Sequence, residues 1–335
     1  MNEITIPYPL SGYIAEYPIG GKWCQQLEAE WCDKFGVSHA IAMNSATSGL
    51  LAACMAIHVN ENYEVIVSPW TMSATAAAPS VLRGMVVFAD INPDTFTLDP
   101  ESVASKITPN TKAVIVTNLF GQPAHLGELM ALCTGAGLYL IEDNSQAILA
   151  KERNRYAGTI GHMGVFSLNV HKHIQTGEGG IVVTNSIELA RNLRGAMNHG
   201  EARDGFPGLN LRMTEITAMM ACKELDRVEY AVLEARNHAK AIKEMLNGSN
   251  NIWYYPAREG CTHSYYCLAI GAKPELHSRL QEIGCKRYLR PLYDLGCFKG
   301  PILPVMEEVW HHVFLIELCH NPQLERIIED LKELK

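Results

Sequence analysis

Short apolar runs alternate with longer amphipathic stretches along the first two hundred residues of the chain. Each apolar run predicts a strand buried on both faces, and each stretch with apolar residues three to four positions apart predicts a helix. The predicted strands cover residues 40–43, 64–70, 85–88, 113–116, 138–143, 165–168 and 181–184. The predicted helices cover residues 22–35, 50–57, 74–82, 100–106, 126–135 and 188–194. This alternation predicts an α/β fold with a mostly parallel, doubly wound sheet.

The last third of the chain has a different pattern. A long amphipathic stretch at 215–246 predicts one helix that links two domains, and the polar residues 248–251 end it. The elements predicted beyond it are strands 252–255 and 265–270 and helices 274–283 and 322–334. A length of 335 residues also favours two domains. We therefore expect a large domain at 1–228 and a small α+β domain at 229–335.

Composition narrows the classes of function. Hydrophobic residues make up 47% of the chain and charged residues 19%, which is typical of a globular protein with a large core. The net charge of −8, without a cluster of Lys and Arg, argues against a nucleic-acid surface. No apolar run is long enough to cross a bilayer, and the N-terminal residues lack the features of a signal peptide. We therefore expect a cytoplasmic protein without a membrane partner.

The cysteines and histidines do not predict a metal site or a disulfide framework. Ten cysteines are scattered without a CxxC pair, and thirteen histidines include no HExxH spacing. We expect the cysteines to be reduced, buried and small apolar side chains, with structural zinc as a remote alternative.

One lysine stands between two predicted strands that enclose a glycine-rich turn. The segment 164–185 reads GVFSLNVHKHIQTGEGGIVVTN, and its lysine is Lys172. A lysine at the mouth of a buried strand either reaches solvent or lies in a pocket, where desolvation lowers its pKa and makes the amine nucleophilic. A solvated loop lysine is the alternative.

The residues around Lys172 favour the pocket. Ser167 precedes the lysine by five positions, and Thr-Gly-Glu-Gly-Gly follows it at 176–180. This phrase resembles the signature of the DegT/DnrJ/EryC1/StrS family of sugar aminotransferases, in which the lysine carries pyridoxal phosphate (PLP) as an internal aldimine. The resemblance implies a fold-type I enzyme in which Ser167 contacts the cofactor phosphate.

Three neighbours of the lysine depart from the commonest family wording. Val170 stands where proline is usual, His171 where Thr or Ser is usual, and His173 where Asn is usual. Some relatives have histidine in place of the lysine and are sugar dehydratases. Counting back from Gly177 puts Lys172, and neither histidine, at the cofactor position.

Two further segments follow predicted strands and have two readings each. Small and hydroxyl residues at 44–49 lead into a helix, where they either cap it or leave free N–H groups for an anion. The resemblance implies that Ala46 and Thr47 belong to a loop that holds the cofactor phosphate. Trp70 is either a core residue or a flat apolar face. The resemblance implies that it stacks on the pyridine ring.

Asp143 ends another predicted strand. It is either a cap for the following turn or the counter-ion of a pyridinium nitrogen, which PLP needs when it acts as an electron sink. The phrase Ile-Glu-Asp-Asn-Ser-Gln-Ala at 141–147 resembles the family's "IEDaaQA". The resemblance assigns Asp143 to the ring nitrogen and Gln146 to the ring's 3-hydroxyl.

The residues after 196 also resemble the family. Residues 197–200 match "rnHG", and 210–216 match "yNyRltdiqAA". The resemblance implies a homodimer with shared active sites, in which Asn210 reaches the cofactor phosphate of the other subunit. The Gly- and Pro-containing loop 204–208 suits such a reach, and a plain surface loop is the alternative.

Taken together, these motifs predict an aminotransferase. The expected donor is glutamate or glutamine, and the expected acceptor is a nucleotide-linked keto-deoxysugar or a keto-cyclitol. A dehydratase is disfavoured by the retained Lys172, and a non-catalytic PLP-binding regulator by Lys172, Asp143 and Gln146 together. A nicotinamide dehydrogenase is disfavoured because no GxGxxG follows an early strand. The arginines of segment 287–293 either meet a diphosphate or are solvated.

Overall fold

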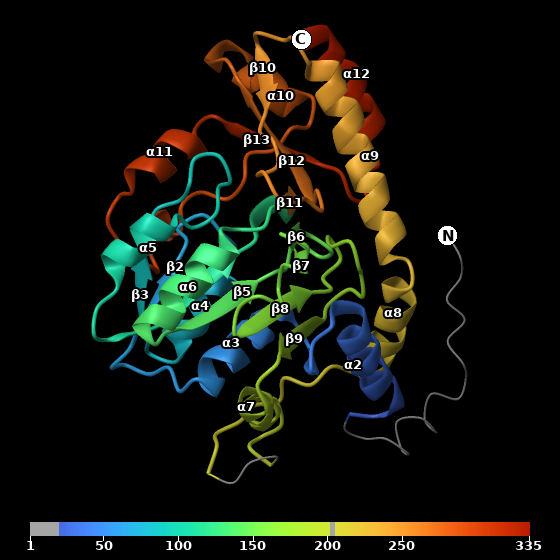
Figure 1. Cartoon of the computed structure of the whole chain (residues 1–335). Helices are drawn as coiled ribbons and strands as arrows, with labels where there is room; N and C mark the ends of the chain where they lie inside the picture. The colour runs from blue at the N-terminus through green and yellow to red at the C-terminus, as the bar shows by residue number, and fades with distance from the viewer. Residues whose placement is uncertain (1–19, 202–204) are drawn as a thin grey trace.

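A seven-stranded mixed sheet forms the centre of the large domain (Figure 1). The computed structural model describes residues 20–201 and 205–335; residues 1–19 and 202–204, which include Asp204 of the loop named above, lie outside the described residues. The strands, in spatial order, are β1 (His39–Met43), β9 (Gly180–Thr184), β8 (Met163–Ser167), β5 (Tyr139–Asp143), β4 (Thr111–Thr117), β2 (Glu64–Val67) and β3 (Met85–Phe88). Strand β9 runs antiparallel to the other six strands, which are parallel to one another, so the prediction of a mostly parallel sheet is confirmed.

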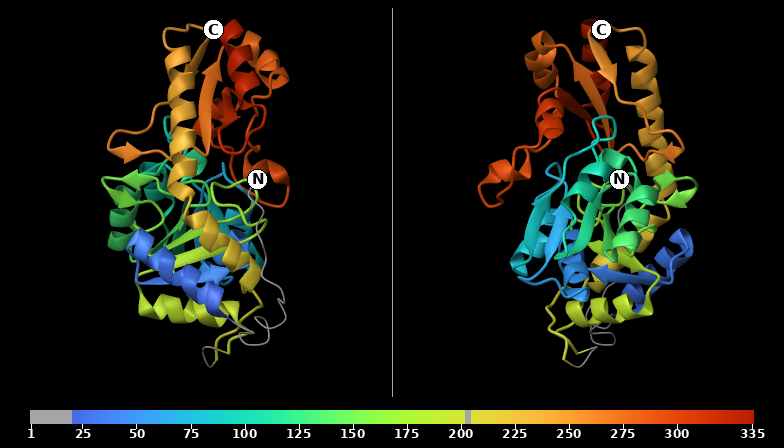
Figure 2. Two further views of the ribbon diagram at one scale, coloured as in Figure 1. Left: turned by 90° about the vertical axis from the view of Figure 1, so that its right-hand side faces the viewer. Right: turned by 60° about the vertical axis from the view of Figure 1, so that its left-hand side comes forward.

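Helices cover both faces of this sheet (Figures 1 and 2). They are α2 (Lys22–Phe35), α3 (Ala46–Ala56), α4 (Ala74–Val81), α5 (Pro100–Lys106), α6 (Leu126–Ala136), α7 (Ile187–Met197) and α8 (Glu215–Leu225). In β2, Val65 and Val67 pack toward α3 and α4, whereas Ile66 packs toward α5 and α6. Burial on both faces explains why the strands read as continuous apolar runs.

The prediction of a single long helix at 215–246 is wrong. The chain forms α8 and then α9 (Val228–Leu246), and at Arg227 between them ψ is −1°, outside the α-helical value. Val228 and Val232 of α9 still pack beside α2 and α8, whereas from Ala235 onward the buried side chains of α9 belong to the small-domain core. The break lets the two helices follow two different cores.

The small domain contains a three-stranded sheet packed against α9. Its strands, in spatial order, are β10 (Ile252–Tyr254), β12 (Cys267–Ala272) and β13 (Val313–Glu317), and its other helices are α10 (His277–Glu282), α11 (Pro304–Trp310) and α12 (Leu324–Leu334). Short 3-10 helices occur at η1 (Leu119–Gly121), η2 (Pro274–Leu276) and η3 (Leu292–Leu295). Neither α11 nor β13 was predicted from the sequence. Among the helices described, none has both the length and the apolar composition that a membrane span requires.

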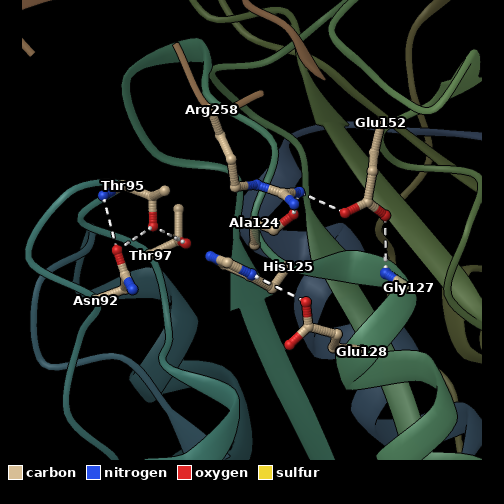
Figure 3. A network of polar contacts seen from close by, with 9 residues as sticks. All are labelled: Asn92, Thr95, Thr97, Ala124, His125, Gly127, Glu128, Glu152 and Arg258. Atoms are coloured by element: carbon tan, nitrogen blue, oxygen red, sulfur yellow. Dashed lines mark hydrogen bonds and ion pairs between the residues drawn. The ribbon is translucent and has the colours of Figure 1, made fainter. Parts of the chain in front are cut away.

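A second small sheet connects the C-terminal part of the chain to the large domain. It pairs β11 (Cys261–Thr262) with β6 (Lys151–Glu152), which also pairs with β7 (Arg155–Tyr156). Near this sheet Arg258 forms an ion pair with Glu152 and donates to the Ala124 carbonyl at 2.8 Å (Figure 3). Glu152 also accepts from the Gly127 N–H at 2.8 Å, so the ion pair connects Arg258 and β6 to the start of α6.

Candidate active site

Three chain segments meet where β1, β8 and β9 lie side by side. Gly180, the first residue of β9, is the register partner of both Met43 and Ser167. A Cβ at Gly180 would lie 2.6 Å from the Ala46 nitrogen, which is closer than real Cβ contacts allow. Glycine at this position therefore permits the loop after β1 to pack directly against the segment that follows Lys172.

Helix α3 begins at Ala46, four residues earlier than the predicted start at residue 50. Ser45 is its N-cap, and the Ser45 hydroxyl oxygen accepts from the Ser48 N–H at 3.1 Å. Ala46 and Thr47 thus lie in the first turn, where backbone N–H groups have no intrahelical acceptor. The positive end of the helix dipole and these N–H groups form an environment suited to an anion.

A pocket of about 480 Å³ opens at the carboxyl ends of the parallel strands. Open α/β sheets bind ligands at this edge. Six of the predicted residues line the pocket: Ala46, Thr47, Asp143, Gln146, Ser167 and Lys172. Trp70 and Asn210 do not. The pocket is also lined by residues that the sequence did not single out, including Thr71, Met72, Thr117, Ser145, Asn169 and Tyr266.

The amine of Lys172 lies within this pocket. Burial lowers the pKa of Lys172, and the negative charge of Asp143 partly opposes that effect. Its Nζ lies 4.7 Å from the centre of the Tyr266 ring. The Lys172 N–H donates to the Asn169 carbonyl at 2.9 Å, which forms a tight turn. A lysine in this state is neutral, and therefore nucleophilic, at a lower pH than a solvated lysine.

The two histidines beside Lys172 have opposite environments. His173 is buried, and its Nε2 lies 3.2 Å from the Ser264 carbonyl, to which it donates. Burial lowers the pKa of His173 to about 4, so the ring is neutral near pH 7. Its hydrogen bond links the segment around Lys172 to the C-terminal part of the chain. His171 is exposed and lines the pocket.

Asp143 is held on the floor of the pocket by two hydrogen-bond donors. The side chain is only 3% exposed. The Thr75 hydroxyl donates to Oδ2 at 3.0 Å, and the Ser145 N–H donates to Oδ1 at 3.1 Å. Within the described part of the chain no Arg, Lys or His forms a salt bridge with it. The carboxylate is therefore oriented and can accept a further N–H from a ligand.

Gln146 connects the large domain to a tyrosine of the C-terminal part of the chain. Its Oε1 accepts from the Phe120 N–H at 2.7 Å, and its Nε2 donates to the Tyr288 hydroxyl at 3.1 Å. Burial raises the pKa of Tyr288, so this hydroxyl stays protonated. The second hydrogen on Nε2 is available to a ligand in the pocket.

The structure places Trp70 behind the pocket, which differs from the ring-stacking position expected from the sequence. The side chain is 1% exposed, and its indole N–H donates to the Leu289 carbonyl at 2.9 Å. The physical reason is packing: the indole lies edge-on against the rings of Phe96 and Phe120 in the core. Met72, two residues later, lines the pocket and is 55% exposed.

Asn210 also lies outside the pocket of its own chain. It is exposed and forms an isolated bridge with Asn198, and its carbonyl accepts from Asn44 Nδ2 at 3.5 Å. This position neither tests nor contradicts a contact with a second subunit, so that role stays a prediction.

The C-terminal part of the chain contributes Tyr266, Arg287, Tyr288 and Leu289 to the pocket. Residues 287–289 fall within the arginine-containing segment that the sequence left open between two readings, whereas Tyr266 had no signal of its own. Because these residues are about a hundred positions beyond Lys172, only the folded chain brings them to it.

The chemistry of the pocket fits PLP. A helix N-terminus suits its phosphate, a buried carboxylate suits its ring nitrogen, and an amine with a lowered pKa suits its aldehyde. These three groups lie around one cavity.

Comparison with known proteins agrees with this fit. GDP-perosamine synthase of Caulobacter vibrioides is 32% identical over 259 residues, which cover 72% of this chain and 70% of that protein. The spore coat polysaccharide biosynthesis protein SpsC of Bacillus subtilis is 31% identical over 234 residues, 65% of this chain and 59% of that protein. The matched region thus spans about three fifths of SpsC.

A solved structure and a family model extend the likeness to most of the chain. The structure of DesV from S. venezuelae has a TM-score of 0.88 and 26% sequence identity, and the match covers 96% of this chain and 93% of that one. The model of the DegT/DnrJ/EryC1/StrS aminotransferase family matches residues 15–300. The chain therefore belongs to the DegT/DnrJ/EryC1/StrS aminotransferase family of PLP-dependent enzymes.

Proposed function

We propose that this protein is an aminotransferase that moves an amino group from glutamate or glutamine to a keto-sugar, nucleotide-linked in the favoured case, or to a keto-cyclitol. The observation that carries the proposal is one pocket that contains Lys172 with a lowered pKa, the buried carboxylate of Asp143 and the first turn of α3. The likeness to GDP-perosamine synthase supports a nucleotide-linked sugar.

Each residue in this proposal has one task. PLP, when bound, would supply an electron sink that stabilises negative charge on the carbon next to the transferred amino group, and an aldehyde that can carry this group. Lys172 attaches the cofactor and then transfers protons as general base and acid. Asp143 accepts the N–H of the pyridine ring, and Gln146 donates to the 3-hydroxyl.

The phosphate of the cofactor is bound at the other end of the pocket. Ala46 and Thr47 offer first-turn N–H groups, and the hydroxyl of Ser167 lies at the adjacent end of β8. Asn210 of a second subunit completes this group in the proposed dimer.

Arg287 is the residue that we assign to the anionic part of a substrate. Its guanidinium packs on the Phe314 ring, with 5.1 Å between the guanidinium carbon and the ring centre, and lies 3.3 Å from His277 Nδ1. No carboxylate among the described residues forms a salt bridge with Arg287, so its charge is available to a ligand. Both a diphosphate and a donor carboxylate present pairs of oxygens that a planar guanidinium can bind in a bidentate manner.

The working unit in this proposal is a cytoplasmic homodimer with shared sites. Exposed apolar side chains at the pocket, Met72 and Leu289, and Leu209 beside Asn210 would be covered by a second subunit. All ten cysteines are free, which suits a reducing compartment. We place the domain boundary between residues 228 and 229.

Borohydride reduction followed by peptide mapping tests the proposal. We expect the purified protein to be yellow, and reduction to fix the cofactor to the peptide that contains Lys172. Lys172→Arg should remove this attachment, whereas Lys286→Arg, a change in a surface lysine paired with Glu317, should keep it. Attachment to any other lysine would contradict the assignment. Transfer of one amino group per site from glutamate or glutamine would then separate an aminotransferase from a regulator.

A further inference from the structure

A chain of three buried threonine hydroxyls ends at Asp143. Thr75 donates to Asp143 Oδ2 at 3.0 Å, the Thr71 and Thr75 hydroxyls are 3.1 Å apart, and the Thr71 and Thr117 hydroxyls are 2.8 Å apart. All four side chains are buried. Thr117 and Asp143 are register partners at the ends of β4 and β5, and Thr71 and Thr75 belong to the turn and first residues of α4.

The number of hydrogens available fixes which group donates in each of these hydrogen bonds. A hydroxyl has one hydrogen to donate, and a carboxylate has none. Since Thr75 uses its hydrogen on Asp143, Thr71 must donate to Thr75, and Thr117 must donate to Thr71. Every hydrogen bond therefore points toward the carboxylate, and bonds aligned in this way polarise one another in a buried setting.

A proton passed from the ring to Asp143 would remove the negative charge toward which these hydrogen bonds point. Hydrogen bonds donated to a charged carboxylate stabilise it relative to the neutral acid. The three threonine hydroxyls thus favour a state in which the proton shared between the bound ring and Asp143 stays on the ring, and the negative charge stays on Asp143.

We propose that Thr75, supported by Thr71 and Thr117, is a positioning residue that keeps Asp143 ionised and aimed at the ring nitrogen of PLP. This inference rests on the proposed function, because it assumes that Asp143 faces the ring. Thr75 itself touches neither substrate nor cofactor and acts only through the carboxylate.

The test measures ring protonation directly. The protein is reconstituted with PLP labelled with ¹⁵N in the ring, and the ¹⁵N chemical shift is followed against pH. In Thr75→Val the ¹⁵N shift at neutral pH should move toward that of an unprotonated ring, because a carboxylate that has lost a donated hydrogen bond holds the shared proton more strongly; the ratio of ring-protonated to Asp143-protonated forms should fall about tenfold or more. Thr75→Ser keeps a hydroxyl and should show the same ¹⁵N shift as the unchanged protein. Thr71→Val should move the ¹⁵N shift in the same direction by less.

A matched control removes a buried hydroxyl elsewhere. Thr97 is buried, and its hydroxyl lies 2.9 Å from that of Thr95 (Figure 3). Neither residue lines the pocket. Thr97→Val should leave the ¹⁵N shift unchanged even if it lowers stability. If Thr75→Val does not fold, the ¹⁵N shift of Thr71→Val provides the same test.

Two results distinguish a failure of the role proposed for Asp143 from a failure of the role proposed for the threonines. If the unchanged protein and Asp143→Asn show the same ring titration, Asp143 does not face the ring and the proposed residue role fails. If Asp143→Asn removes ring protonation but Thr75→Val and Thr71→Val show the same ¹⁵N shift as the unchanged protein, the threonine chain has no effect on the proton and this inference is overturned.

Discussion

Gly49 in helix α3 is the position where one added methyl group should disturb the phosphate end of the pocket. A Cβ at Gly49 would lie 2.9 Å from Val165 Cγ1 and 2.9 Å from Val182 Cγ2, two fully buried side chains in β8 and β9. Both strands lie inside the seven-stranded sheet, so neither valine has free space to move into. Gly49→Ala should therefore push α3 away from the sheet.

The size of the effect follows from two opposing contributions. Overpacking of a core by one carbon costs about 1–3 kcal/mol. Alanine in a helix interior recovers about 1 kcal/mol relative to glycine. The net loss in free energy of unfolding should therefore reach up to about 2 kcal/mol. Because Ala46 and Thr47 lie one turn before Gly49, the same displacement should weaken PLP binding.

Gly135 in α6 provides the matched control, because a Cβ there meets no heavy atom within 4 Å. Gly135→Ala should raise stability by about 0.5–1 kcal/mol through helix propensity alone. Urea denaturation midpoints of the apo proteins and PLP titrations by absorbance measure both effects. If the two variants have the same midpoint and the same PLP affinity as each other, the packing contact does not constrain α3 and the reasoning is refuted.

Three further predictions concern the site. Since burial lowers the pKa of Lys172, the rate of PLP attachment to the apo protein should rise with pH through a midpoint below the 10.5 of an ordinary lysine; a midpoint at or above that value would mean a solvated amine. Arg287→Gln should raise the KM of the anionic substrate about tenfold or more while Arg290→Gln, at an exposed position outside the lining, leaves it unchanged, and steady-state kinetics will show whether the two variants differ. Lys172→Ala and Asn210→Ala, each inactive alone, should regain activity in mixed dimers, because both lesions then fall in one site; verified mixed dimers without activity would place Asn210 in its own subunit's site or in none.

Local patterns along the chain were enough to predict the central sheet and the order of the chemical groups along it. The inner strands are buried on both faces and have no polar side to break their apolar runs, and the edge strand β3, whose Met85 is exposed, is still an apolar run. All seven strands were therefore predicted from local pattern. Asp143 was readable because it ends such a strand, and Lys172 because it lies in the connection between two such strands, each within a family phrase. Local signals of this kind depend on residues that are neighbours in the chain.

Which side chains face the pocket depends on how distant parts of the chain pack together. Trp70 packs against two aromatic rings of the core whereas Met72 lines the pocket, and no periodicity predicts the direction of a side chain after its strand ends. The long stretch at 215–246 became two helices because its halves pack in different cores. Arg287 reached the pocket because the C-terminal part of the chain folds back over the strand ends. Contacts between residues so distant in sequence form when apolar surfaces are buried together, and local secondary-structure propensity does not predict them.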